Sequence, residues 1–174
     1  GVDLRKESQK VAPYITDSIQ HYMVKNIMEA YDYLINDDGS GEIADLGGIK
    51  SSDDVIDITL YHLKYAKEGK VSQSIENLYQ VCGQAQKSIR WKYHNGDKVF
   101  NHLLKRDEKW IHDGKSSRIL KGTSTDLVKL REEATNRKEI RYHVVIVQPG
   151  MSKSNCTHEM KVLLGSTLQV LKQM

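Results

Sequence analysis

Hydrophobic and polar positions repeat with two different periods along the first part of this chain. In residues 14–30, apolar side chains recur every three or four positions, as in an amphipathic helix. In residues 31–36, 43–50 and 55–65, the apolar and polar positions follow the shorter period of β-strands, and "DDGSG" and "SSDD" supply turn residues between them. The pattern predicts a helix followed by an antiparallel meander of three strands.

The second half of the chain predicts further helices and one more strand. Residues 73–91 form a strong helical pattern, residues 142–147 a short apolar strand and residues 158–172 a final helix. Residues 92–138 are interpreted as an insertion of uncertain structure, in which "DKVFNHLLKR" and "TDLVKLREEATNRK" look helical. We expect residues 1–174 to form a single α/β domain with a mixed central sheet flanked by helices.

The third predicted strand ends in an unusual way. Ile56, Ile58 and Leu60 share one face because side chains alternate along a strand, and His62 and Lys64 continue that face. A buried ammonium without a partner costs several kcal/mol, so an anionic group is expected at this end of the sheet.

Carboxylates in the second predicted strand are the candidates for this anionic group. Asp45 lies within "IADL", a strand position that disfavours a carboxylate, and Glu42 precedes it at the turn. In a meander the start of the second strand is close to the end of the third, so Asp45, His62 and Lys64 are expected to converge. An ordinary ion pair between Asp45 and Lys64 is the structural alternative.

These residues carry a resemblance to a known family. A helix, a three-strand meander with Asp45 in its second strand and Lys64 at the end of its third, then a helix and a strand, resemble the PD-(D/E)XK nuclease superfamily. The chain is also similar to domains attached to large bacterial helicases and linked with phage defence, in the segments "DDGSGEIAD…LYHLKYAK…VCGQAQKSIRW…QPG". The resemblance implies a restriction-endonuclease-like core and a metal-dependent nuclease that hydrolyses DNA.

The resemblance also implies roles for individual residues. Asp45 matches the aspartate that holds a divalent metal, and Lys64 matches the lysine that orients or deprotonates the attacking water. His62 stands where the family usually has Glu or Asp, so either His62 is a nitrogen ligand, or Glu42 supplies the second carboxylate, or the site is inactive. The backbone carbonyl of Leu63 is a further expected ligand, and Mg²⁺ or Mn²⁺ the expected cofactor.

The helix predicted at residues 73–91 adds candidates for nucleic-acid contact. Gln86 lies on its apolar face, either as a core group or as a group that reaches the site; Arg90 follows one turn later at the edge of that face. Lys87 is expected to meet a phosphate backbone or to be an ordinary surface lysine. In the first turn, Asp37 and Asp38 are interpreted as turn formers, with Asp38 as an alternative metal ligand.

Composition changes this picture little. The chain has 174 residues, a net charge of +3 and two cysteines without metal-ligand spacing, which favours a soluble cytoplasmic protein with reduced thiols. No apolar run is long enough to span a membrane. We expect DNA and a helicase or other defence-system subunit or domain as partners, and leave a homodimer open. The alternative function is a catalytically inactive nuclease-fold module that binds nucleic acid or protein.

Overall fold

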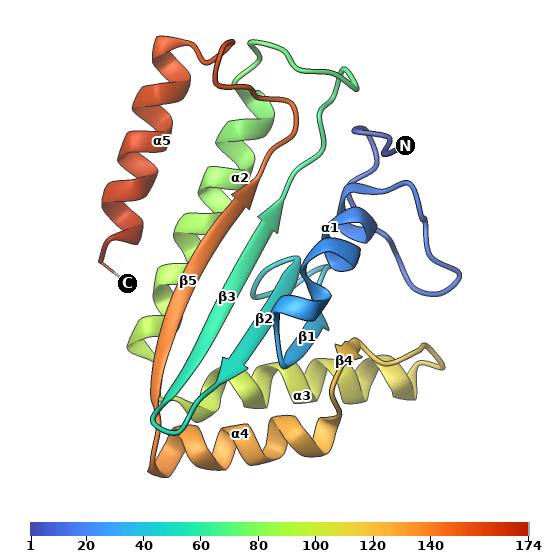
Figure 1. Cartoon of the computed structure of the whole chain (residues 1–174), viewed down its shortest axis with the longest axis vertical. Coiled ribbons are helices and arrows are strands. Elements are labelled where there is room, and N and C mark those ends of the chain that lie inside the picture. The colour runs from blue at the N-terminus through green and yellow to red at the C-terminus, as the bar shows by residue number, and fades with distance from the viewer. Residues whose placement is uncertain (174) are drawn as a thin grey trace.

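The computed structural model describes residues 1–173 and has an α/β architecture built on one mixed five-stranded sheet (Figure 1). The strand order is β4-β1-β2-β3-β5. The first three strands form an antiparallel meander, β5 lies parallel to β3, and β4 pairs with β1 at the other edge. The strands are β1 (Tyr33–Asn36), β2 (Leu46–Ser51), β3 (Val55–Leu63), β4 (Ile119–Lys121) and β5 (Glu139–Val147).

Helices cover both faces of the sheet (Figure 1). The helix α1 packs on one face, whereas α2, α3 and α4 cover the other, and α5 lies beside α2. Among residues 1–173, no helix combines the length and the apolar character needed to cross a membrane. The α-helices are α1 (Ile19–Ile27), α2 (Glu76–Lys87), α3 (Asp97–His112), α4 (Ser124–Asn136) and α5 (His158–Leu171), and 3₁₀ turns occupy Met28–Ala30 and Ser88–Tyr93.

The alternation predicted for the third strand is confirmed in β3. Ile56, Ile58 and Leu60 are buried in the cluster formed with α3 and α4. Tyr61 and Leu63 point to the opposite face and pack in the cluster that contains α1. The two faces of β3 are therefore both covered, and every position from Ile58 to Leu63 is buried.

The first helix is shorter than its sequence pattern suggests. It begins at Ile19 because Ser18 acts as the N-cap, with its hydroxyl accepting a hydrogen bond from the His21 amide at 3.2 Å. The apolar residue Ile15 instead belongs to an irregular segment, where its amide donates to the Gln9 carbonyl.

The glycine pair in β2 marks a close approach of a side chain. The pairing of β2 runs through Gly47 and Gly48 in regular register with both neighbouring strands, so this pair forms no bulge. A Cβ atom on Gly48 would lie 2.6 Å from the ring of Tyr31. Glycine at this position makes room for the Tyr31 ring, whose hydroxyl lies 2.6 Å from that of Tyr61.

The segment between residues 92 and 138 is built into the main core. Its helices α3 and α4 bury Phe100, Leu103 and Leu127 against strands of the central sheet. The polar residues 113–118, which follow α3, lead into β4, and this strand extends the sheet beyond β1. This segment also supplies contacts to the candidate site.

Candidate functional site

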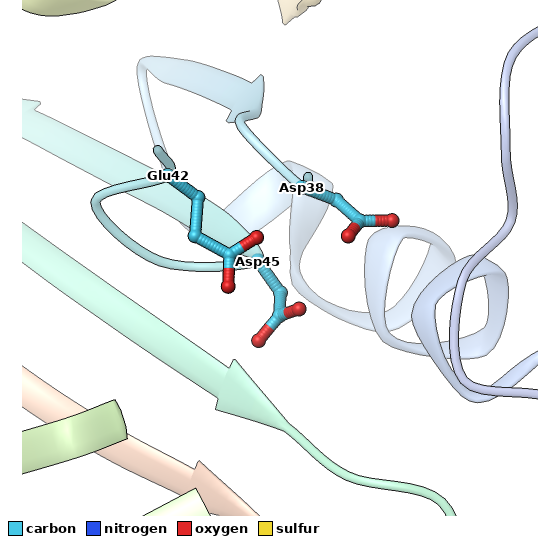
Figure 2. Close-up of side chains that lie close together, drawn as sticks. All are labelled: Asp38, Glu42 and Asp45. Carbon is cyan, nitrogen blue, oxygen red and sulfur yellow. The ribbon is translucent and has the colours of Figure 1, made fainter. Parts of the chain in front are cut away.

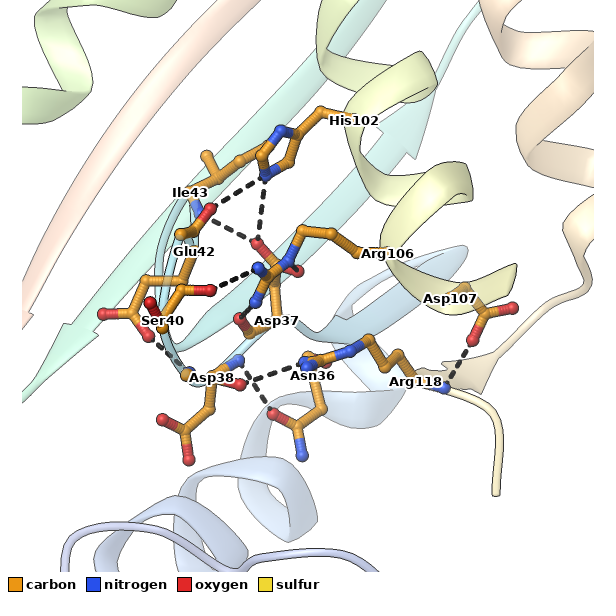
Figure 3. Close-up of polar contacts among 12 residues, drawn as sticks. Asn36, Asp37, Asp38, Ser40, Glu42, Ile43, His102, Arg106, Asp107 and Arg118 are labelled. Atoms are coloured by element: carbon orange, nitrogen blue, oxygen red, sulfur yellow. Dashed lines mark hydrogen bonds and ion pairs between the residues drawn. The ribbon is translucent and has the colours of Figure 1, made fainter. Parts of the chain in front are cut away.

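The loop between β1 and β2, residues 37–45, is held in place by α3 (Figure 3). The Arg106 guanidinium pairs with the Asp37 carboxylate and donates to the carbonyl oxygens of Ser40 at 2.6 Å and Asp37 at 2.8 Å. The His102 Nε2 atom lies 3.0 Å from the carbonyl oxygen of Gly41. Burial raises the pKa of Asp37, while the Arg106 charge opposes this effect. These contacts give the loop a defined shape on a rigid helix.

This loop carries three carboxylates that lie close together (Figure 2). One carboxylate oxygen from each of Asp38, Glu42 and Asp45 lies within 4.8 Å of the other two. Figure 2 shows them beside the point where β3 ends. Asp38 accepts a hydrogen bond from the Ser8 hydroxyl, and Glu42 accepts one from the Gly39 amide at 2.6 Å. The cluster has the oxygen ligands that Mg²⁺ and Mn²⁺ prefer.

Asp45 is the most deeply buried member of this cluster. Its residue is 3% exposed, and its Oδ2 atom accepts a hydrogen bond from the Leu63 amide at 2.7 Å. Burial raises the pKa of Asp45 to about 8, and the negative charges of Glu42, Asp38 and Glu7 contribute to the increase. The expected placement of Asp45 next to the end of the third strand is therefore found. Asp45 does not lie within the second strand as predicted, however, because β2 begins only at Leu46 and Asp45 belongs to the preceding loop.

Lys64 lies one residue beyond β3, and its partner comes from the N-terminal segment. The ammonium forms an ion pair with Glu7 at 3.0 Å, and the Lys64 side chain is 14% exposed. The same Glu7 carboxylate accepts a hydrogen bond from the Tyr65 amide at 3.0 Å. The anionic partner expected for Lys64 thus exists, but it is Glu7 instead of Asp45 or Glu42.

His62 points to the buried face, as predicted, but its contacts lead to α2. Its residue is 2% exposed, and its Nε2 atom lies 2.7 Å from the Ser88 hydroxyl. Burial lowers the pKa of His62 to about 4, so the ring is neutral near pH 7. The Nδ1 atom makes no hydrogen bond with any residue in 1–173. His62 is not one of the three residues of the carboxylate cluster.

The three residues of the helix predicted at 73–91 that were expected to contact nucleic acid do not lie together in the structure. Lys87 and Arg90 line a cavity of about 350 Å³ together with Glu42 and His62. Gln86 does not line this cavity, because its amide donates to the Thr167 hydroxyl on α5 at 3.0 Å. Gln86 therefore does not reach the site, and its amide group is used in the packing of α2 against α5. Gln84 lines the cavity instead.

The buried Asp45 predicts a pH dependence of the free energy of unfolding in metal-free buffer. Between about pH 6.5 and 8, native Asp45 keeps a proton that the unfolded aspartate, with a pKa of 3.8, has lost. The native state therefore binds more protons, and stability falls as the pH rises through this window, by at most about 1.4 kcal/mol per pH unit. Denaturant unfolding of the wild type and of Asp45→Asn from pH 6.5 to 9 measures the effect.

His62 contributes little to the pH dependence of stability above about pH 6.5, because it is then neutral in both the native and the unfolded state. Below about pH 6.5 the unfolded histidine takes up a proton that native His62, with a pKa of about 4, does not. His62 therefore lowers stability as the pH falls and opposes Asp45 there. Parallel curves for the wild type and Asp45→Asn above pH 6.5 would show that native Asp45 is ionised.

Several site residues were not found by sequence reasoning. Glu7 and Ser8 lie far from the meander in sequence, in a segment without helical or strand periodicity, and no local signal points to them. Ser88 follows α2 and is recognisable only once His62 is placed opposite it. Comparisons of the chain with protein-family models, with curated proteins and with solved structures found no match, so the arrangement of these residues carries the functional argument.

Proposed function

We propose that this chain is a metal-dependent nuclease domain that hydrolyses phosphodiester bonds in DNA. The observation that carries the proposal is the clustering of Asp38, Glu42 and Asp45, whose carboxylate oxygens lie within 4.8 Å of one another at the end of β3. Lys64 follows directly after that strand end. A group of carboxylates next to a lysine is the combination that the PD-(D/E)XK resemblance implies.

The order of the elements also supports this class. The chain runs from α1 through the meander β1–β2–β3 to α2, and β5 then pairs in parallel with β3. The helices α1 and α2 lie on opposite faces of the sheet. A restriction-endonuclease-like core has this helix, meander, helix and strand arrangement.

The charge balance of the site favours a bound cation. Glu7, Asp38 and Glu42 surround Asp45 closely enough that their charges raise its pKa, whereas Lys64 is the ammonium that pairs with Glu7. Several carboxylates that share a small, partly buried region repel one another unless a proton or a cation joins them. A divalent ion would relieve this repulsion and replace the Asp45 proton.

The residues present fit Mg²⁺ or Mn²⁺. Asp38, Glu42 and Asp45 would hold the ion, and the Leu63 carbonyl stays a predicted additional ligand. His62, which was also predicted as a ligand, is not part of this cluster. A bound divalent cation neutralises charge that develops on phosphate oxygens and lowers the pKa of a bound water. Lys64 would donate hydrogen bonds to the attacking water or to the phosphate, and Glu7 would hold the ammonium in position.

The experiment is a cleavage assay on labelled single-stranded and duplex DNA with Mg²⁺, with Mn²⁺ and with EDTA. We expect cleavage with the metals and none with EDTA. Asp45→Asn keeps an oxygen that can accept the Leu63 hydrogen bond but removes a charged ligand. Its affinity for Mn²⁺, measured by titration calorimetry, should fall by about 10- to 100-fold or more, because even loss of a group that only supports a metal ligand costs this much.

One observation favours a second function. His62 replaces the usual acidic residue and is bonded to Ser88, which fits a catalytically inactive nuclease-fold module that binds nucleic acid or protein. DNA binding without cleavage under either metal, and unchanged binding in Asp45→Asn, would select this function. The predicted helicase or defence-system partner and the homodimer depend on the same nuclease proposal, whereas the proposed cytoplasmic location rests on the two cysteines expected to be reduced.

A further inference from the structure

Two cavities lie on either side of the loop that carries the carboxylates. The first, of about 350 Å³, lies between this loop and the C-terminal end of α2 and includes Glu42 in its wall. The second, of about 230 Å³, lies between the N-terminal segment and the connection from α3 to β4, and includes Asp38. Gly39 of this loop lines both cavities, so the two adjoin at the loop.

Buried polar atoms without a partner are concentrated at these two cavities. Five such side-chain atoms occur among residues 1–173, and four of them belong to residues that line one cavity or the other. Native proteins bond nearly all of their buried polar groups. The orphan atoms belong to His62, Gln84 and Trp91 at the first cavity and to Arg118 at the second, and they indicate that a polar ligand or an ordered water completes their hydrogen bonding.

The charges of both cavity walls suit a polyanion. Lys87 and Arg90 line the first cavity. Lys10, Lys115 and Arg118 line the second. Arg118 is 7% exposed and is fixed by donating to the carbonyl oxygens of Asn36 and Asp38 (Figure 3), so its charge has a defined position. Cations on both sides of a carboxylate cluster would hold phosphates that the cluster itself repels.

The second cavity also has aromatic walls. Tyr14 and Trp110 line it. The Lys115 ammonium and the Arg118 guanidinium each lie 3.8 Å from the centre of the Trp110 ring, so Tyr14 is the ring on which a base can stack. Cations combined with aromatic rings are the usual surface for a nucleotide, whose phosphate and base need different neighbours. In a duplex the bases are stacked and paired, so a base can enter such a cavity only from an unpaired strand.

We propose that the two cavities bind neighbouring nucleotides of an unpaired polynucleotide strand, on either side of the phosphate that lies at the carboxylates. The proposal rests on the nuclease function for the role of those carboxylates. It adds the substrate class, which is a polynucleotide that is single-stranded where it contacts the protein. It also assigns Lys87 to the contact with the strand in the first cavity and Lys115 to the contact in the second.

The test is fluorescence anisotropy with a labelled 12-nucleotide single strand and with the matching duplex, in metal-free buffer containing EDTA. We expect the single strand to bind more tightly than the duplex. Lys87→Ala and Lys115→Ala, both at exposed residues, should each weaken single-strand binding several-fold and reduce the salt dependence by about one phosphate contact. Tyr14→Ala should weaken it about five-fold or more. Lys161→Ala, at an exposed residue of α5, is the charge-matched control.

The outcomes separate this proposal from the proposed function. Metal-dependent cleavage by the wild type, combined with Lys87→Ala and Lys115→Ala variants that bind like Lys161→Ala, would overturn the two-cavity proposal alone. Single-strand binding through both cavities, without cleavage under any metal, would support it and refute the nuclease. Duplex binding as tight as single-strand binding would refute the unpaired substrate.

Discussion

Replacing Lys64 with methionine is expected to reduce metal-dependent cleavage by about 10²- to 10⁴-fold, the range that a positioned proton-transfer group typically contributes. Methionine keeps an apolar chain of similar length and removes only the ammonium. The carboxylates of the cluster remain, so the affinity for Mn²⁺ should be unchanged or higher because one positive charge has been lost from the site. Single-turnover cleavage and titration calorimetry measure the two quantities separately.

A matched lysine controls for a general effect of charge. Lys67 lies three residues further on, and its exposed side chain pairs with Glu76 at 3.3 Å. Lys67→Met should leave the cleavage rate within about two-fold of the wild type, because surface ion pairs contribute little. If Lys64→Met folds normally and also keeps nearly the wild-type rate, the ammonium has no part in the reaction.

Replacing Phe100 with alanine should lower the free energy of unfolding by about 3–5 kcal/mol, the usual cost of deleting a buried phenyl ring. Phe100 lies on α3, is 0% exposed, and packs in the cluster that includes Ile49 and Ile58 of the central sheet. The loss should appear in one cooperative urea transition of the whole protein, because α3 shares its core with β2 and β3.

An exposed residue of the same helix provides the control. Ile111 is 51% exposed, so Ile111→Ala should change the free energy of unfolding by well under about 1 kcal/mol. A separate early transition in Phe100→Ala, with amide exchange in β3 still slow, would show that residues 92–138 fold independently of the sheet.

The sequence predicted most of the secondary structure because hydrophobic periodicity is a local property. The predicted alternation of side chains between the two faces of the strand at residues 55–63 is confirmed. The two helices expected between residues 92 and 138 are present as α3 and α4. The strand β4 was missed because its three residues, Ile119–Lys121, are too few to display a period. The contribution of α3 and α4 to the main core depends on packing between distant segments, which periodicity does not reveal.

The candidate site likewise contains some contacts that local sequence predicts and others that it does not. The meander brings Asp45 to the end of β3 through short turns, so this proximity could be predicted from neighbouring elements. Glu7 reaches Lys64 across 57 positions of sequence, and no local pattern encodes such a contact. Gln86 was misplaced because the apolar face of α2 is shared with α5, and the helix pattern does not identify which element covers it.

The sequence by itself determined the helices, the meander and the residue types that make metal-dependent chemistry plausible, since these depend on side-chain order along short segments. Only the tertiary structure decided that Asp38 joins Glu42 and Asp45, that Glu7 pairs with Lys64, and that cavities lie on both sides of the loop. Those features arise where segments far apart in the chain meet, and their geometry follows from the packing of α3 and the N-terminal segment around the sheet.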